Sequence, residues 1–138
     1  MATTQNTMPK AKHVLKEDRP AVAIGHVQID THAVVETIDF FRSIGLRHIF
    51  RNENYGVLEL RGGTHLLVSK RDTPVAKGTD VPFDIMVDNI KTAHRDFGKK
   101  GLAPSEMTSG EIHTSFYIEA PSGHRLKITS SHAGNRAI

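Results

Sequence analysis

Apolar residues follow two different spacings in the first half of this chain. Closely spaced and β-branched residues fill positions 22–29, and apolar residues three and four apart then recur from Val34 to Phe41, before Gly45. The first spacing is typical of a strand and the second of one helix face, with Thr31 as the expected N-cap. Three short apolar runs follow at 47–51, 55–60 and 64–69, divided by polar or glycine residues as in antiparallel strands. The pattern predicts a β-α-β-β-β unit.

The same order of elements begins again after a linker at 71–80. A strand is expected at 83–87, a helix at 90–97 with Asp88 or Asn89 as its cap and Gly101 at its end, and a hairpin of strands at 112–118 and 125–129. Residues 26–46 align without a gap with residues 82–102, a period of 56, and 63–69 align with 123–129. We therefore expect an α+β fold of two tandem β-α-β-β-β units, with the functional site between the copies.

The length of 138 residues fits one domain, which we place at 21–131 with units at about 21–70 and 81–131. Residues 1–20 and 132–138 are expected to be tails. The net charge is +3, and residues 1–20 hold four basic and two acidic side chains, so +2 of that charge lies there and +1 remains for the rest. A nearly neutral fold with few aromatic residues argues against nucleic-acid binding.

The absence of cysteine excludes disulfides and thiolate ligands, so histidine must provide any soft-ligand chemistry. No run approaches the roughly 20 apolar residues that a transmembrane helix needs, and the first residues do not resemble a signal peptide. We expect a cytoplasmic protein that does not bind a membrane.

A Pro-Ser-Gly-His turn at 121–124 precedes the last expected strand. Together with the duplicated units, this turn resembles the vicinal oxygen chelate superfamily, which includes glyoxalase I, extradiol dioxygenases, and fosfomycin and bleomycin resistance proteins. The resemblance covers about residues 21–130 and implies a cupped mixed sheet. Since this fold serves many reactions and also metal-free binding, it does not identify a function.

The resemblance also implies where a metal would be held. Metal-dependent members use one residue from the first strand and one from the last strand of each unit, and the corresponding positions here are His26, Leu67, Pro82 and Lys127. Only His26 is a metal ligand, because leucine and proline side chains have no lone pair and a protonated lysine repels a cation. We expect no metal and no other cofactor. A divalent metal bound by His26 and His65 is the alternative if the strand register differs by a step.

Alternation along the strands places further polar residues on the same face as these positions. We predict that Asp84 pairs with Lys127, either as a structural replacement for the metal or beside a ligand-contacting lysine. Tyr117 is expected in the wall of the site, with Ser115 and His113 as weaker candidates. The predicted ligand-binding residues are His26, Gln28, His65, Leu67, Asp84, Tyr117, Lys127, His113 and Ser115.

Three functions remain open from the sequence. The first is a metal-independent protein that encloses a small anionic or oxygen-rich organic molecule. The second is an enzyme of the same superfamily, either metal-dependent or using His26 and Lys127 as acid/base and charge-stabilising groups. The third is a structural module without a ligand. We also expect a homodimer, because each unit ends in an open sheet edge.

Overall fold

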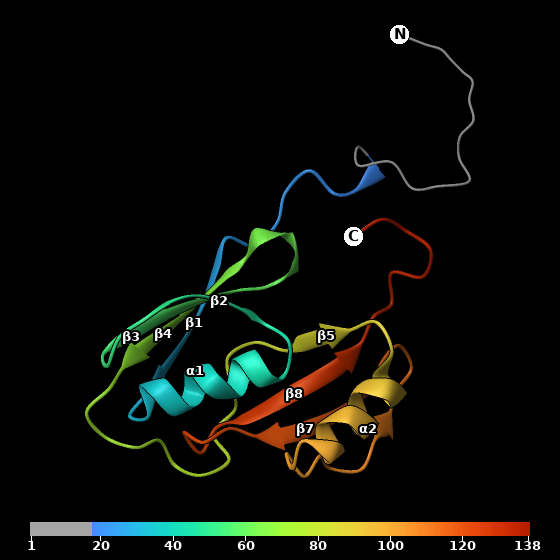
Figure 1. Cartoon of the computed structure of the whole chain (residues 1–138). Helices are drawn as coiled ribbons and strands as arrows, with labels where there is room; N and C mark the ends of the chain where they lie inside the picture. Colours follow the sequence, from blue (N-terminus) through green and yellow to red (C-terminus); the bar gives the residue numbers. More distant parts are fainter. Residues whose placement is uncertain (1–17) are drawn as a thin grey trace, which may run out of the picture.

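The computed structural model describes residues 18–138, and both predicted units are present (Figure 1). The expected tail at 1–20 lies mostly outside the described residues. The first unit comprises β1 (His26–Thr31), α1 (Val34–Ser43), β2 (Arg47–Arg51), β3 (Tyr55–Glu59), the short 3-10 helix η3 (Arg61–Gly63) and β4 (His65–Lys70). The second comprises β5 (Ile85–Val87), α2 (Ile90–Lys99), β6 (Thr108–Ser109), β7 (Thr114–Glu119) and β8 (Arg125–Ser130).

The strands form two four-stranded mixed sheets with matching topology. The first sheet has the order β1-β4-β3-β2 and the second the order β5-β8-β7-β6. In each sheet the first strand of the unit is parallel to the last one, and the other pairs are antiparallel. The predicted α+β class and the duplication are confirmed.

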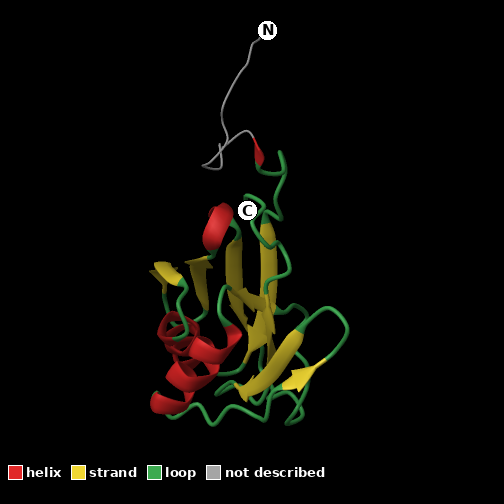
Figure 2. Cartoon of the chain, turned by 90° about the vertical axis from the view of Figure 1, so that its right-hand side faces the viewer, coloured by secondary structure: helices red, strands yellow, loops and turns green. Residues whose placement is uncertain are grey.

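One face of each sheet is covered by its own helix. Buried side chains alternate along β3, β4, β7 and β8, and α1 packs on the first sheet while α2 packs on the second. Figure 2 shows the two helices on the same side of the strands. Among residues 18–138, no helix packs on the opposite face of either sheet, and we call these two surfaces the open faces. Because strand side chains alternate, the predicted site residues on the strands fall on the open faces.

Side chains from both units meet in a common core. Phe41 on α1 is fully buried, and its ring centroid lies 6.3 Å from that of Phe83, just before β5. In the 3-10 helix η3 of the first unit, Arg61 donates two hydrogen bonds of 3.0 Å to the carboxylate of Asp88 in the second unit. These contacts fix the two units against each other, so the fold places both open faces in one rigid frame.

Three local predictions were wrong. The first strand begins at His26 rather than at Val22, because Val22 and Ile24 are exposed and lie before β1. Thr31 is the last residue of β1; its Oγ1 accepts a hydrogen bond from the Ala33 N–H at 2.9 Å, but Ala33 is the N-cap of α1. The two-residue strand β6 was missed, since Thr108 and Ser109 give no apolar signal. Asn89 caps α2 as predicted, accepting from the Thr92 N–H.

The Pro-Ser-Gly-His turn is a structural element that orients β8. His124 is 5% exposed, and its Nδ1 shares a hydrogen bond of 2.6 Å with the Ser122 hydroxyl. Gly123 has φ +92°, a left-handed conformation that glycine adopts without strain.

Among residues 18–138, no helix is long and apolar enough to span a membrane.

Burial of His124 predicts a loss of stability in mild acid. Desolvation lowers the pKa of His124 below 6.5, with Arg71 and His32 acting in the same direction and Asp30 opposing them. Below about pH 6.5 this histidine binds a proton in the unfolded chain more readily than in the folded protein, so the free energy of unfolding falls as the pH decreases. We expect the melting temperature of His124→Gln to fall less than that of the wild type between pH 7.5 and 5. An equal or greater fall in the variant would contradict this assignment.

Candidate functional site

The open face of the first sheet carries a row of four polar side chains across all its strands. The Cα partners are His26 on β1 with His65 on β4, His65 with Glu59 on β3, and Glu59 with Arg47 on β2. The His26 and His65 ring centroids are 6.2 Å apart. The predicted residues His26 and His65 are therefore neighbours, and Glu59 and Arg47 extend the row.

Glu59 connects the two ends of this row. Its carboxylate accepts hydrogen bonds from the Arg47 guanidinium and lies 3.3 Å from His65 Nε2. The Arg47 hydrogen bond, aided by His65, lowers the pKa of Glu59 although desolvation acts in the opposite direction. The carboxylate is thus ionised at neutral pH and orients the His65 ring.

An apolar band lies beside this row on the same face. Leu67 pairs with Val57, Val57 pairs with Phe50, and Phe50 is 49% exposed. Gln28, on β1 next to Leu67, donates a 2.8 Å hydrogen bond to Asp30. The first open face therefore offers an apolar floor next to imidazole, carboxylate and guanidinium groups.

The open face of the second sheet carries two basic side chains, Arg125 and Lys127. Lys127 on β8 pairs with Tyr117 on β7, and both side chains are half-buried. The Arg125 guanidinium lies 4.1 Å from the centre of the Tyr117 ring and also forms an ion pair of 2.9 Å with Asp80. Arg125 is thus paired with a carboxylate and stacked, whereas Lys127 forms no ion pair with any residue from 18 to 138.

The predicted pair between Asp84 and Lys127 is wrong. Within the part of the chain that the structure describes, neither side chain forms a hydrogen bond or an ion pair. Asp80, four residues earlier, provides the carboxylate for this sheet, but it binds Arg125. The physical reason is that Arg125 lies directly across a bridge from Asp80 and binds its carboxylate, so Asp80 is not the partner of Lys127 either. Lys127 remains available for another partner.

Lys127 lines a shallow hollow of about 390 Å³ at one end of the second open face. The hollow is bounded by β8, β7 and the β6–β7 hairpin, so it includes two weaker candidates from the sequence, Ser115 and His113. Its lining residues are Thr108, Gly110, Glu111, Ile112, His113, Ser115 and Lys127. Tyr117, Asp84 and the first-sheet candidates lie outside it.

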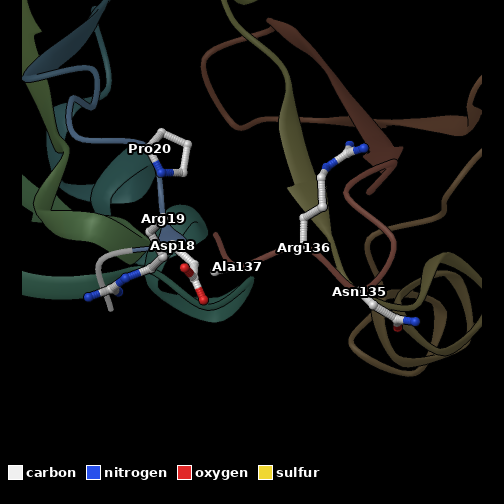
Figure 3. A pocket seen from close by; sticks show the side chains of 6 residues that line it. All are labelled: Asp18, Arg19, Pro20, Asn135, Arg136 and Ala137. Carbon is white, nitrogen blue, oxygen red and sulfur yellow. The ribbon is translucent and has the colours of Figure 1, made fainter. Parts of the chain in front are cut away.

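A second hollow of about 420 Å³ is lined by residues from both ends of the described chain (Figure 3). It is formed by residues 18–20 and 135–137, which come from the two terminal segments. Figure 3 shows these side chains spread over two separate stretches of chain, with Arg136 and Asn135 pointing away from Pro20. Because the side chains do not converge, we do not assign a function to this hollow.

The residues at the superfamily's metal positions do not fit a metal. Leu67 and Pro82 have no donor atom, and Lys127 is a cation. Between residues 18 and 138, no group of three or more His, Asp and Glu side chains is arranged to hold a metal ion. Glu59, which lies next to His65, already binds Arg47. We therefore derive no chemical step through a metal at this site.

The overall structure is similar to several solved structures. They include lactoylglutathione lyase from Agrobacterium tumefaciens (16% identity, TM-score 0.67, covering 83% of this chain and 97% of that one). A glyoxalase/bleomycin resistance protein/dioxygenase from Alicyclobacillus acidocaldarius gives 17% identity and a TM-score of 0.63, covering 81% and 93%. A possible glyoxalase from Bacillus cereus gives 19% and 0.61, covering 78% and 98%.

These likenesses establish the fold. The chain has the glyoxalase/bleomycin resistance/dioxygenase-like fold of these structures, as the duplication and the turn motif predicted. No family model matches the sequence, and no curated protein matches it. Identities of this size carry no information about substrate or reaction, so the function must be argued from the open faces.

Sequence reasoning missed three residues of the open faces, Arg47, Glu59 and Asp80. It placed Arg125 on the face of Lys127 but did not count it among the ligand-binding residues. Alternation along 55–59 was a usable signal for Glu59, because Tyr55, Val57 and Glu59 must share one face. Nothing in the sequence indicates that Arg125 takes Asp80 as its partner, since residues 80 and 125 are distant in the chain.

Proposed function

We propose that this protein binds a small anionic or oxygen-rich organic molecule on its open faces without a metal. The observation that carries the proposal is the half-buried side chain of Lys127, which lines a hollow and forms no hydrogen bond or ion pair within residues 18–138. A lysine side chain that is partly covered and has no acidic partner leaves its ammonium N–H donors available to a ligand. A carboxylate or similar oxygen-bearing group of a ligand would supply the missing partner.

The groups around Lys127 support the same class of ligand. The hydroxyl groups of Ser115 and Thr108 and the imidazole of His113 line the hollow and can donate hydrogen bonds to oxygen atoms. Tyr117 lies directly across from Lys127. On the first sheet, the apolar band of Leu67, Val57 and Phe50 is suited to the carbon skeleton of an organic molecule.

A thermal-shift screen of chelator-treated protein tests this proposal. The library pairs carboxylate-bearing organic molecules with their methyl esters or amides. A molecule that binds only the folded state raises the melting temperature by mass action. We expect stabilisers among the acids, with weaker or no effect from the matched neutral compounds. Stabilisation that requires an added metal, or a preference for the neutral compounds, would reject the proposal.

Metal analysis provides a separate prediction. We expect that zinc, nickel, iron and manganese do not co-purify in stoichiometric amount when neither affinity metal nor chelator is used. The reason is that three of the four superfamily positions lack a ligand atom. Excess chelator should leave the melting temperature unchanged. One metal per chain that is lost in His26→Gln would overturn the prediction and favour the His26–His65 alternative.

An acid/base enzyme is the second candidate, and the His65–Glu59 contact favours it. A carboxylate that orients an imidazole is a common arrangement for a general base. In this case a stabilising ligand would be consumed or would exchange a proton with solvent deuterium, as observed by proton NMR. Such turnover should be lost in His65→Gln, whereas a pure binding protein leaves the ligand unchanged.

We also propose that the chain forms a homodimer. The edge strands are β1 and β2 in the first sheet and β5 and β6 in the second. All five residues of β2 are exposed, including Ile49 and Phe50. Covering such an edge avoids nonspecific strand pairing. Light scattering should give about twice the chain mass of 15.2 kDa at micromolar concentration. A value near the mass of one chain would contradict the proposal.

A further inference from the structure

Two histidines at the ends of β7 and β8 lie in direct contact, away from the His26–His65 pair. His113 precedes β7 and His132 follows β8. His113 Nε2 lies 2.9 Å from His132 Nδ1, and the ring centroids are 4.6 Å apart. A hydrogen bond between two neutral imidazoles accounts for this distance. The same distance also suits two imidazoles that bind one ion.

The backbone holds both residues in place. The His113 carbonyl accepts from the Gly110 N–H at 2.7 Å, and the Thr114 N–H donates to the Ser130 hydroxyl at 3.0 Å. On the other side, the His132 carbonyl accepts from the Arg136 guanidinium at 2.9 Å. These hydrogen bonds do not involve the imidazole nitrogens of His113 and His132. Apart from their contact with each other, both rings can therefore bind a ligand.

The nitrogen–nitrogen distance matches that of two imidazoles on one metal ion. With metal–nitrogen bonds of about 2.0–2.1 Å, two ligands at a right angle are separated by about 2.8–3.0 Å, and tetrahedral ligands by about 3.3–3.4 Å. The observed 2.9 Å fits the right angle of square-planar or octahedral ions. Each imidazole would carry its proton on its other ring nitrogen, His113 on Nδ1 and His132 on Nε2.

We propose that His113 and His132 form a binding site for a divalent late transition-metal ion such as Ni²⁺ or Cu²⁺. The ion replaces the hydrogen bond between the rings, and water fills its other positions. His113 also lines the hollow beside Lys127, so the ion lies at the rim of the proposed ligand site. With only two protein ligands the ion exchanges readily, so it is not expected to co-purify with the protein.

Calorimetric titration of tag-free protein with NiCl₂ and CuCl₂ tests the site. We expect one ion bound per chain at pH 7.5, weaker binding at pH 5.5 because protons compete with the ion for the ligand nitrogens, and no binding of Mg²⁺. His132→Gln should abolish the binding without lowering the melting temperature of the metal-free protein by more than a few degrees. His48→Gln, at an exposed histidine on β2, is the matched control and should bind as the wild type does.

A third variant separates this site from the open face. His26→Gln should leave the binding intact, because His26 lies on the first sheet. Loss of binding in His26→Gln with retention in His132→Gln would overturn the proposal and assign the ion to the His26–His65 pair. Wild-type protein that binds neither ion would show that the His113–His132 contact is only a hydrogen bond. With Cu²⁺, electron paramagnetic resonance should show nitrogen coupling that is lost in His132→Gln.

Discussion

Replacing Lys127 with methionine is expected to weaken the binding of a carboxylate-bearing ligand by about 1.5–3 kcal/mol, or about 10- to 150-fold in Kd. Methionine keeps the length of the aliphatic stem and removes the ammonium group, so the loss reports a charge-assisted hydrogen bond. The free energy of unfolding without ligand should change little, because Lys127 forms no hydrogen bond or ion pair within residues 18–138. Isothermal titration calorimetry and urea denaturation measure the two quantities.

Lys91→Met is the control for this experiment. Lys91 is exposed on α2, on the helix-covered side of the second sheet, so its removal changes the net charge equally without touching the open face. The control should retain wild-type affinity. A large loss of stability in Lys127→Met with unchanged affinity would show that the lysine has a structural role and does not contact the ligand.

Replacing Phe41 with alanine is expected to lower the free energy of unfolding by about 3–5 kcal/mol. The Phe41 side chain is fully buried, packs edge-on against Phe40 with ring centroids 5.1 Å apart, and contacts Phe83 of the second unit. Its removal leaves a cavity where the two units meet. Because one residue serves both units, the denaturation curve should shift as a single transition.

Val35→Ala, on the same helix, provides the comparison. Val35 is 36% exposed, so its truncation should cost much less than that of Phe41. Two separate transitions in Phe41→Ala would show that the units unfold independently, contrary to the common core described above.

The sequence was sufficient to predict the fold because the relevant signals are periodic. The spacing of Val34, Ile38 and Phe41 predicted α1, and the period of 56 residues predicted the second unit. Alternation along the strands, together with the family resemblance, placed His26 and His65 on one face of the sheet. In the structure these two residues are Cα partners. Patterns that repeat every two or four residues are robust to small errors in element boundaries.

The pairing of charged side chains could not be predicted in the same way. Alternation assigns a residue to a face, but Asp80 and Asp84 are both near β5, and Arg125 and Lys127 are both on β8. Which acid reaches which base depends on strand register and on side-chain conformation, and here Asp80 binds Arg125. A short polar strand such as β6 also escapes detection, since its formation depends on pairing with β7 rather than on its own composition.

The most direct test of metal-independent binding at the open face is an NMR titration of chelator-treated, ¹⁵N-labelled protein with the best carboxylate stabiliser. We predict that the amide signals of Ser115, Tyr117 and Lys127 shift most, with smaller changes along α1 and α2. Shifts confined to the terminal hollow at residues 18–20 and 135–137, or shifts that occur only after metal is added back, would contradict the account.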